Sequence, residues 1–552
     1  MKILRVNLTK KTGDIEAIDD EFSSVIGGRG LGVALFTREV NPNVEPLQPD
    51  NKLIFTPGAL TGSSIPFSAR HNATSISPLT DTIFSSNAGG NFGCELARTG
   101  YNGVIIEGRA SSPLYLHIDD CGVDFRDASH LWGCDVFDTT MMLKKECGVY
   151  FRNTLVIGTG GEQGVRFANI MTQLHRAFGR GGLGAVMGSK NLKAIVATGD
   201  NPIPSDQYRD IDSGLWKKVV DGVGGLKSMG TPSILQVANE NNALPTKNYS
   251  TTAYEDAEMI SGEALRKYTI NQSTCHSCLI ACKRVTQSKK HDIITEGPEY
   301  ETLMSFGSNL CVNNLDDVIK SNYLCNRYGL DTLSTGAAIA SLMEASEKKR
   351  VEYEIKWGDG EKVHEVIELI ARRKGIGAEL AHGAAIFAEK HRVPFYTVKG
   401  MDFPGHDPRG AAGQGLSYAV SNRGADHLYS MEYIEEYGNP NRNNISGKAD
   451  QVIYNENRNA VLDSISLCKF SIRFYTTNDY LTILSKITEN LSEEDMQKLG
   501  SRIVEMERQF NCKRGFNRKD DTLPKIMKPS GFEEELERYY HLRGWNENGC
   551  TP

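Results

Sequence analysis

The chain has 552 residues, of which 39% are hydrophobic and 24% are charged, and its formal net charge is −7 at pH 7. This length predicts several domains, and the acidic balance argues against a nucleic-acid-binding protein, which usually carries a basic face. No apolar run approaches the roughly 18 to 20 residues that cross a bilayer, and the N-terminal segment lacks the apolar core of a signal peptide. We therefore expect a cytoplasmic protein with no membrane span and no nucleic-acid partner.

The first two hundred residues are typical of a β-rich domain. Residues 1–17 alternate like a strand and then turn. Further short β-type runs, each bounded by Gly, Asp or Pro, occupy 52–60, 102–110, 113–119, 153–160 and 193–200.

Three glycine-rich loops, at 27–32, 85–93 and 179–190, interrupt these runs. In the third loop, successive backbone N–H groups could surround a phosphate ahead of a helix. The loop matches neither the P-loop nor a dinucleotide fingerprint. The residues of the loop are equally compatible with binding a phosphate-bearing ligand and with forming tight turns between strands. They do not indicate a nucleotide.

After residue 203 the pattern becomes helical, with apolar residues at three- and four-residue spacing in 315–329, 332–349 and 361–375. A Gly- and Pro-rich segment at 394–415 separates two helical stretches. The sequence thus predicts an α+β protein, with a β-rich domain at 1–203 followed by two mainly α-helical domains at 204–405 and 406–552.

A cysteine motif lies within the predicted second domain. Cys275, Cys278 and Cys282 have C-x2-C-x3-C spacing, which suits three corners of an iron–sulfur cubane with a remote fourth ligand. Zinc is the alternative, with His276 or His291 completing a Cys3His site, but the second C-x2-C pair of a zinc ribbon is missing. The spacing favours the cluster and does not identify the fourth ligand.

Nine further cysteines are scattered through the chain. Free cysteine packs as a small hydrophobic residue, and a reducing compartment keeps thiols reduced. We therefore expect each scattered cysteine, taken from the residues alone, to be a structural thiol.

Several motifs together resemble one family over essentially the whole chain: the tungsten- or molybdenum-dependent aldehyde:ferredoxin oxidoreductases. The matching stretches lie, in order, at 27–32, 77–93, 179–196, 275–282, 296–302, 326–336, 407–427, 462–470 and 539–545.

The resemblance implies a β-rich first domain that forms a base for the cofactor, with two helical domains covering it. It also implies a tungsten (or molybdenum) bis-molybdopterin, a Mg²⁺ ion bridging the pterin phosphates, and one [4Fe-4S] cluster. The glycine-rich loops then become cradles for the pterin. By position, the first-domain residues that meet the cofactor are Arg70, Asn87, Gly89, Arg180, Gly181 and Gly182.

Two further pterin contacts in the family come from D-x-x-G-L-[CD] motifs. The first implies contacts from Asn326, Gly329, Leu330 and Asp331, with Asn in the usual Asp position. The second implies contacts from Asp463 and Leu467, with Ser466 in place of Gly, which puts the local backbone geometry in doubt. The resemblance also supplies the fourth cluster ligand, Cys468.

The resemblance leaves the metal without a protein ligand, so the protein's part is positioning and proton transfer. A Glu of the segment 296–302 would act as the base, with Glu301 favoured over Glu299. His427 would donate to an oxo ligand or a substrate oxygen, and His406 is a weaker alternative for that role.

The implied activity is oxidation of an aldehyde to a carboxylate, with electrons passed to ferredoxin or a ferredoxin-like subunit. Two alternatives stay open: the catalytic subunit of a low-potential reductase resembling benzoyl-CoA reductase, and an electron-transfer subunit without the pterin. Asp317 and Lys320 stand where a metal-bridged family dimer would need Glu-x-x-His. Both a homodimer and a hetero-oligomer therefore remain open.

Overall fold

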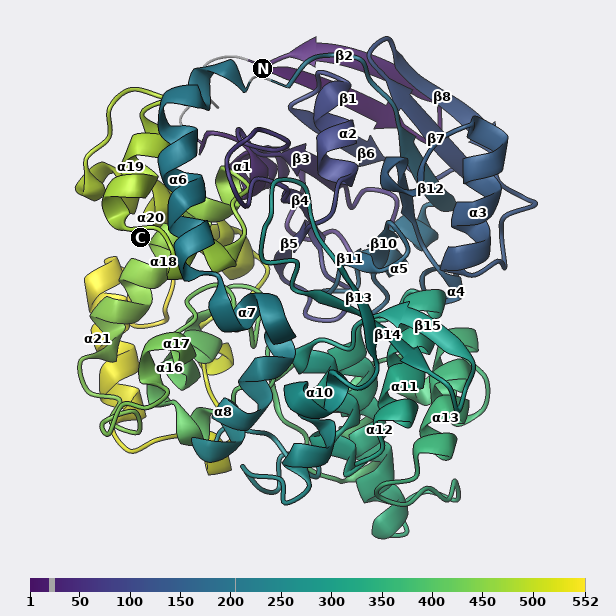
Figure 1. The fold of residues 1–552 in the computed structure, drawn as a ribbon, viewed down its shortest axis with the longest axis vertical. Helices are drawn as coiled ribbons and strands as arrows, with labels where there is room; N and C mark the ends of the chain where they lie inside the picture. The colour runs from purple at the N-terminus through teal and green to yellow at the C-terminus, as the bar shows by residue number, and fades with distance from the viewer. Residues whose placement is uncertain (19–24, 204, 552) are drawn as a thin grey trace.

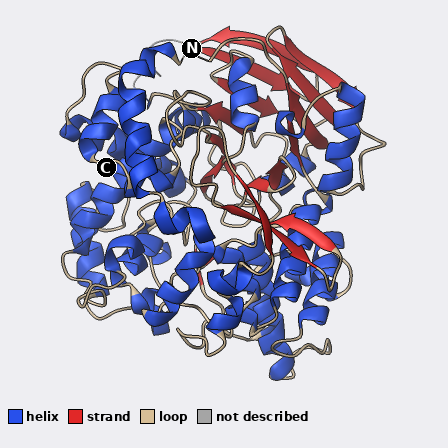
Figure 2. Ribbon diagram, in the orientation of Figure 1, coloured by secondary structure: helices blue, strands red, loops and turns tan. Residues whose placement is uncertain are grey.

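A computed structural model describes residues 1–18, 25–203 and 205–551. Figures 1 and 2 show strands gathered at the N-terminal end of the molecule and helices filling the rest. No helix in the described ranges is both long and apolar enough to span a bilayer. The predicted α+β fold, with a β-rich first part and mainly helical later parts, is confirmed.

Two mixed sheets make up the β-rich part. In the described chain the first sheet has the order β2-β1-β6-β3-β4-β5 and the second β11-β10-β9-β12-β7-β8. The strands of the first sheet are β1 (Lys2–Asn7), β2 (Thr12–Ala17), β3 (Leu53–Pro57), β4 (His71–Ile76), β5 (Ile83–Ala88) and β6 (Gly103–Glu107). Those of the second are β7 (Leu114–Asp119), β8 (Gly122–Asp127), β9 (Thr154–Val156), β10 (Ile170–Thr172), β11 (Arg176–Phe178) and β12 (Leu192–Ala197).

Alternation along β6 explains how the first sheet packs on both faces. Val104 and Ile106 share a core with residues of the second sheet, such as Leu116. Ile105 points to the other face, into a core that contains residues of α1 (Gly28–Glu39) and Phe510 of α20 (Glu493–Lys513). Successive strand residues face opposite sides, so the apolar run buries both faces of the sheet.

Short helices connect these strands, and a mainly helical region follows. The first part contains α1 (Gly28–Glu39), α2 (Phe92–Arg98), α3 (Val136–Cys147), α4 (Thr159–Glu162) and α5 (Leu183–Ser189). The middle part contains α6 (Arg209–Gly222), α7 (Gly224–Met229), α8 (Ile234–Glu240), α9 (Gly262–Leu265), α10 (Tyr300–Phe306), α11 (Leu315–Tyr328), α12 (Thr332–Glu347), α13 (Gly360–Arg372), α14 (Ile376–Leu380) and α15 (Ala384–His391).

The last part is helical apart from one short hairpin. It contains β16 (Thr397–Val398), β17 (Met401–Asp402), α16 (Ala412–Val420), α17 (Tyr433–Glu436), α18 (Lys448–Ser464), α19 (Thr477–Leu484), α20 (Glu493–Lys513) and α21 (Phe532–Arg543). A capping box begins α20, where Ser492 Oγ accepts the Asp495 N–H at 3.1 Å, satisfying a helix-terminal donor that would otherwise be unpaired.

Two further features belong to the mainly helical region that the sequence predicts after residue 203. An antiparallel sheet of β13 (Thr269–Ser273), β14 (Lys283–Ser288) and β15 (Ile293–Glu296) interrupts the middle part. Helix α6 packs against α19 of the last part, where Lys218 pairs with Asp479 at 2.6 Å; the two helices lie side by side in Figure 1.

The expectation of thiols at all scattered cysteines is wrong for Cys512 and Cys550, which form a disulfide. Cys512 lies near the end of α20 and Cys550 at the end of the chain, so the bond ties the C-terminal segment to that helix. The two cysteines are 38 residues apart in the sequence, and this spacing does not predict a disulfide. The sulfurs meet because the C-terminal segment folds back onto α20.

Candidate functional site

The motif cysteines occupy one loop. Cys275, Cys278 and Cys282 all lie between β13 and β14, and all three are partly buried free thiols. This loop forms no helix and no strand. The side chains of its three cysteines can therefore turn toward a common point, as the C-x2-C-x3-C spacing predicts.

Backbone hydrogen bonds of Phe67 bring the fourth cysteine to this loop. The Phe67 N–H donates to the Ser277 carbonyl at 2.8 Å, and the Phe67 carbonyl accepts the Cys468 N–H at 3.0 Å. The thiol of Cys278 interacts electrostatically with both Cys275 and Cys468. Segments almost two hundred residues apart in sequence thus contribute sulfurs to one site.

Two arginines, Arg70 half-buried and Arg176 buried, face the sulfurs. Arg70 Nη2 lies 3.4 Å from Cys468 Sγ, and Arg176 Nη1 lies 3.6 Å from Cys275 Sγ. A cationic donor stabilises a thiolate or a cluster sulfide more than a neutral donor does. The sequence analysis missed Arg176, although it lies three residues before the third glycine loop.

The donor set fits an iron–sulfur cluster. Burial and neighbouring sulfurs raise the pKa of Cys278 to about 11, so the cysteines would become thiolates together only with a compensating cation, which cluster iron supplies. Neither zinc-ligand candidate points at the sulfurs. His276 Nε2 lies 3.2 Å from the Ser63 carbonyl, and His291 Nε2 lies 2.8 Å from Asp317 Oδ1.

The second glycine loop approaches the same sulfurs. The Gly90 N–H donates to Cys275 Sγ at 3.2 Å, and a Cβ on Gly89 would lie 3.1 Å from that sulfur. A side chain at 89 would therefore crowd the cysteine. This gives the predicted cofactor residue Gly89 a packing reason to be glycine.

Asn87, at the end of β5, offers an unused donor. Its Nδ2 is buried and has no hydrogen-bond partner among the described residues, while its carbonyl accepts Arg70 Nη1 at 3.3 Å. A buried donor without a partner is costly. A polar group of a bound cofactor would satisfy it, so this residue fits its predicted role.

Arg180 has protein partners from both helical parts. Its Nε lies 3.4 Å from Asp331 Oδ2, Nη1 donates to the Ala425 carbonyl at 3.0 Å and Nη2 to the Asp402 carbonyl at 2.8 Å. The adjacent glycines are closely packed as well, Gly181 against Phe84 and Gly182 against the Arg166 carbonyl. These contacts hold the third loop against the helical parts, and the predicted pterin contacts of its residues stay a prediction.

The first pterin motif ends α11 and begins α12. Gly329 has a φ of +68°, a left-handed conformation that favours glycine, and its carbonyl accepts the Asn169 N–H at 2.9 Å. Asp331 caps α12 by accepting the N–H groups of Leu333 and Ser334. Within the motif, Asn326 lies in the last turns of α11 and Leu330 pairs with the backbone of Ala168.

The second pterin motif follows α18. Asp463 pairs with Lys469 Nζ at 2.7 Å and lies 3.5 Å from Arg29 Nη1. Ser466 has a φ of +66°, so it adopts the left-handed geometry that the family's glycine would take, despite the doubt raised by the substitution. Leu467 is buried beside it.

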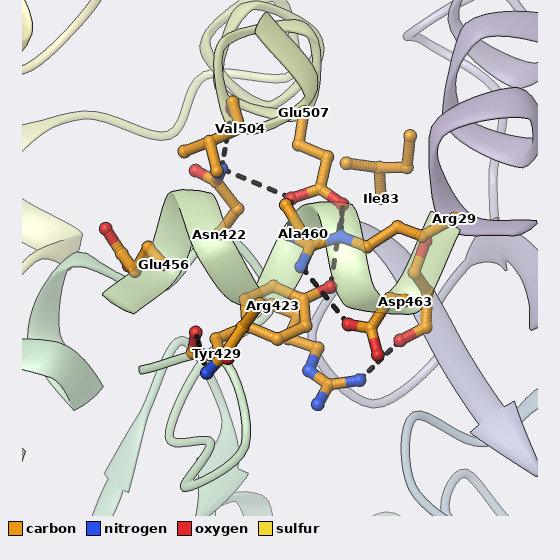
Figure 3. Close-up of polar contacts among 12 residues, drawn as sticks. Arg29, Ile83, Asn422, Arg423, Tyr429, Glu456, Ala460, Asp463, Val504 and Glu507 are labelled. Atoms are coloured by element: carbon orange, nitrogen blue, oxygen red, sulfur yellow. Dashed lines mark hydrogen bonds and ion pairs between the residues drawn. The ribbon is translucent and has the colours of Figure 1, made fainter. Parts of the chain in front are cut away.

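Figure 3 shows a buried network around Arg29 that the sequence analysis did not identify. Arg29 donates to both carboxylate oxygens of Glu507, at 2.9 and 2.8 Å. The Tyr429 ring lies between two guanidinium groups, 3.6 Å from that of Arg29 and 4.0 Å from that of Arg423. Arg29 stands inside the first glycine loop, so its position was visible, but its partners lie more than four hundred residues away.

The candidate bases point in different directions. Glu299 Oε2 accepts the Thr231 hydroxyl at 2.7 Å, and Glu299 Oε1 lies 3.6 Å from Lys283 Nζ. Glu301, in the first turn of α10, accepts the Gly405 N–H through Oε2 at 2.7 Å. Its Oε1 is buried without a hydrogen-bond partner in the described chain, and burial raises the Glu301 pKa. Glu299 Oε1 is also buried without a hydrogen-bond partner in the described chain, so the two histidines that face Glu301 Oε1 are what favour Glu301 as the base.

Two histidines face that oxygen. His427 Nε2 lies 3.5 Å and His406 Nε2 3.7 Å from Glu301 Oε1, and the three atoms lie within 4.8 Å of one another. The predicted base and the two predicted histidines are therefore brought together from the middle and last parts of the chain. A carboxylate can accept a proton and a histidine can accept or donate one, so these three side chains carry the groups that general acid–base catalysis needs.

A surface cavity of about 480 Å³ lies beside the cysteine loop. Among the residues lining it are His276 of the motif and two arginines, Arg98 and Arg152. Residues of α2 and of the segment around residue 200 form its other walls.

Comparison with family models covers nearly the whole chain. The model "Aldehyde ferredoxin oxidoreductase, N-terminal domain" matches residues 3–199, and "Aldehyde ferredoxin oxidoreductase, domains 2 & 3" matches residues 215–552.

Similar proteins match at full length. The tungsten-containing aldehyde ferredoxin oxidoreductases of Pyrococcus furiosus and Thermococcus kodakarensis are each 40% identical, and each alignment covers 100% of this chain and 97% of the relative. The aliphatic sulfonate oxidoreductase WOR-like subunit of Pyrococcus furiosus is 29% identical over 99% of this chain and 95% of its own. Among solved structures, the active site complex BamBC of benzoyl coenzyme A reductase matches with a TM-score of 0.85 and 23% identity, covering 100% of this chain and 95% of that one.

Proposed function

This chain belongs to the aldehyde ferredoxin oxidoreductase family, and we propose that it oxidises an aldehyde to a carboxylate and passes the electrons to ferredoxin. The observation that supports this most directly is the 40% identity, over the whole chain, to proteins named tungsten-containing aldehyde ferredoxin oxidoreductase. Their name favours tungsten over molybdenum. A Mg²⁺ ion bridging two pterin phosphates is part of the same proposal.

The four cysteines would hold a [4Fe-4S] cluster, a role supported by their convergence and by the cationic side chains of Arg70 and Arg176. The pterins would be held by Arg70, Asn87, Gly89, Arg180, Gly181, Gly182, Asn326, Gly329, Leu330, Asp331, Asp463 and Leu467. The unpaired Asn87 Nδ2 supports a polar ligand there. When bound, the tungsten pterin supplies two-electron redox chemistry and the cluster a one-electron exit.

The reaction consumes one aldehyde and one water and yields one carboxylic acid, two protons and two electrons. Glu301 would accept a proton from the water, because its Oε1 is unpaired and burial raises its pKa toward a useful range for a base. His427, 3.5 Å from the same oxygen, would donate to the substrate oxygen. Glu299 is the less favoured base, since Thr231 already donates to it.

Ferredoxin, or a ferredoxin-like subunit, would take the electrons singly. The surface cavity beside His276 supports this side of the molecule as the exit, because it lies next to the cysteine loop. The proposal keeps the predicted domain limits of 1–203, 204–405 and 406–552. It also keeps both predicted oligomeric states, a homodimer and a hetero-oligomer. The similarity to the benzoyl coenzyme A reductase complex, at 23% identity, concerns the fold alone.

Anaerobic purification with metal analysis, followed by an aldehyde panel with a viologen dye, tests this function. We expect about one tungsten and about four irons per chain, with dye reduction that depends on the aldehyde. About four irons without tungsten or molybdenum would favour the electron-transfer subunit instead. Full metal content without activity on any aldehyde would contradict the proposed substrate class.

A further inference from the structure

Three tyrosines hold His406 in one orientation. The Tyr437 hydroxyl lies 2.7 Å from His406 Nδ1, and the Tyr433 ring stacks on the imidazole with centroids 3.6 Å apart. The Tyr418 hydroxyl donates to the His406 carbonyl at 3.0 Å. His406 is 1% exposed, so its ring has one orientation and one neighbour at each nitrogen.

The environment also determines which nitrogen carries the proton. Burial, with a smaller contribution from His427, lowers the pKa of His406 well below its usual value, so the ring is neutral and has a single N–H. Among the described residues, His406 Nδ1 is the only hydrogen-bond partner of the Tyr437 hydroxyl. A buried hydroxyl that donates to nothing is costly, so Tyr437 donates, Nδ1 accepts, and the imidazole proton resides on Nε2.

The Nε2–H of His406 faces Glu301 Oε1, which has no hydrogen-bond partner in the described chain. The distance between the two atoms leaves room for a small molecule that binds to both. Glu301 Oε1 lies 3.7 Å from His406 Nε2 and 3.5 Å from His427 Nε2, longer than direct hydrogen bonds of about 2.7–3.2 Å. All three atoms lie within 4.8 Å of one another. One oxygen atom just outside their plane could therefore lie at about 2.8 Å from each.

We propose that Glu301 Oε1, His406 Nε2 and His427 Nε2 bind one oxygen atom, that of the water consumed in the reaction, and that Tyr437 is the positioning residue that makes His406 a donor to it. The inference rests on the proposed aldehyde oxidation, which requires a water. It adds a role for His406 and Tyr437 beyond the base and the donor already proposed.

The arrangement has a direct chemical consequence. The water donates one O–H to Glu301 and the other to His427 Nε2, and it accepts the His406 Nε2–H, which leaves one lone pair for the aldehyde carbon. As the C–O bond forms, the O–H bond breaks and its proton goes to Glu301, while the π pair of the aldehyde C=O moves onto the carbonyl oxygen. The aldehyde C–H bond then breaks, the C=O bond re-forms, and the second proton is released. The two electrons of the C–H bond would be taken up by the redox centre of the proposed function.

The variant Tyr437→Phe tests the positioning role, because it removes the hydroxyl and keeps the ring. His406 is then free to place its proton on Nδ1, and the water loses its donor. We expect kcat to fall about tenfold with little change in KM. A hydrogen-bond donor near a carboxylate favours its ionised form, so losing it should move the acidic limb of the kcat profile to higher pH.

Other ionisable groups face Glu301 and must be considered in that profile. Those that influence its pKa are His427, Arg180 and Asp331, and it in turn influences Tyr249, Tyr300, Tyr418, Tyr433 and Tyr437. The variant Tyr437→Phe alters none of their charges at neutral pH, since burial raises the pKa of Tyr437 well above 10.

A double-variant cycle separates positioning from general damage. Glutamine at 406 keeps an N–H donor but has no tautomer to fix, so Tyr437→Phe should have almost no effect in the His406→Gln background. The matched control is Tyr353→Phe, which removes a hydroxyl that donates to Glu365 on the surface at 2.9 Å. Iron and tungsten contents and melting temperatures are measured for every variant, so the cycle remains decisive if one variant loses cofactor.

A readout independent of activity is the ¹⁵N spectrum of histidine-labelled holoenzyme, with the His406 signals assigned by their loss in His406→Gln. We expect a neutral ring protonated at Nε2 in the native protein and a shift toward Nδ1 protonation in Tyr437→Phe. Protonation at Nδ1 in the native protein, or an unchanged pH profile in a fully loaded Tyr437→Phe enzyme, overturns the inference. If the native protein oxidises no aldehyde, the proposed function fails, while the spectrum still decides the role of Tyr437.

Discussion

At the scale of single residues, charge around the sulfurs is the feature that most affects the cluster site. Arg70 and Arg176 each reach one cysteine sulfur; Arg70 is half-buried and Arg176 is buried, at 8% exposure. Cationic donors favour the more negative, reduced state of a cluster. The two arginines would therefore affect electron transfer through the cluster as well as the binding of its iron.

Cys468 gives the sharpest test at this scale. Replacing it with serine exchanges a soft thiolate for a hard, weakly acidic hydroxyl, so Cys468→Ser should bleach the visible absorption of the cluster or change its EPR spectrum. The exposed Cys121 provides the control, and Cys121→Ser should leave both unchanged. A native spectrum in Cys468→Ser would remove Cys468 from the ligand set.

At the scale of elements, α1, α18 and α20 are joined by one buried network. Arg29 is the second residue of α1, Asp463 lies one residue before the end of α18 and Glu507 lies within α20, and Figure 3 shows their side chains meeting. The network fixes the first glycine loop against the segment that carries Asp463 and Cys468. Its geometry therefore affects both the predicted pterin contact and the fourth cluster ligand.

Removing the charge of Glu507 should be strongly destabilising. Glu507→Gln leaves the Arg29 guanidinium buried, at 1% exposure, with one carboxylate at 3.5 Å. Breaking a buried pair in this way costs about 3–5 kcal/mol. Thermal melting of the loaded protein measures the loss, and Glu505→Gln on the same helix, where the carboxylate accepts the Ser501 hydroxyl at 2.7 Å, is the matched control. Equal melting temperatures for both variants would contradict a structural role for the network.

At the scale of the whole molecule, residues from every part of the chain meet at the cysteine site, and residues of the middle and last parts meet around Glu301. The β-rich part contributes Arg70 and Arg176, the middle part Glu301 and three cysteines, and the last part Cys468 and His427. The C-terminal segment, tied back by the disulfide, packs on α20, where Arg508 Nε donates to the Gly549 carbonyl at 2.5 Å.

The disulfide should stabilise this last part by restricting the unfolded chain. A bond that closes a loop of 38 residues contributes about 4 kcal/mol in the chain-entropy description. We expect Cys512→Ser, or a reductant, to lower the unfolding midpoint of the protein, and Cys121→Ser to leave it unchanged. Non-reducing peptide mapping establishes the bond directly, and its absence there would rule the stabilisation out.

The sequence by itself determined the fold class, several strands of the β-rich part and three of the longer helices, because local alternation and helical spacing depend on neighbouring residues. The ranges 315–329, 332–349 and 361–375 became α11, α12 and α13. The motifs also placed the family, which the full-length comparisons confirm. The sheet β13-β14-β15 was missed because its short strands carry polar, weakly alternating residues.

Only the tertiary structure decided which side chains meet. The spacing of Cys275, Cys278 and Cys282 indicated a cluster, yet nothing local indicated that Phe67 would pair with both Ser277 and Cys468. The same holds for Arg176 at Cys275, and for Tyr437 at His406. These contacts join residues from about 30 to almost 400 positions apart, and their energies come from burial and partner geometry, which no short stretch of sequence encodes.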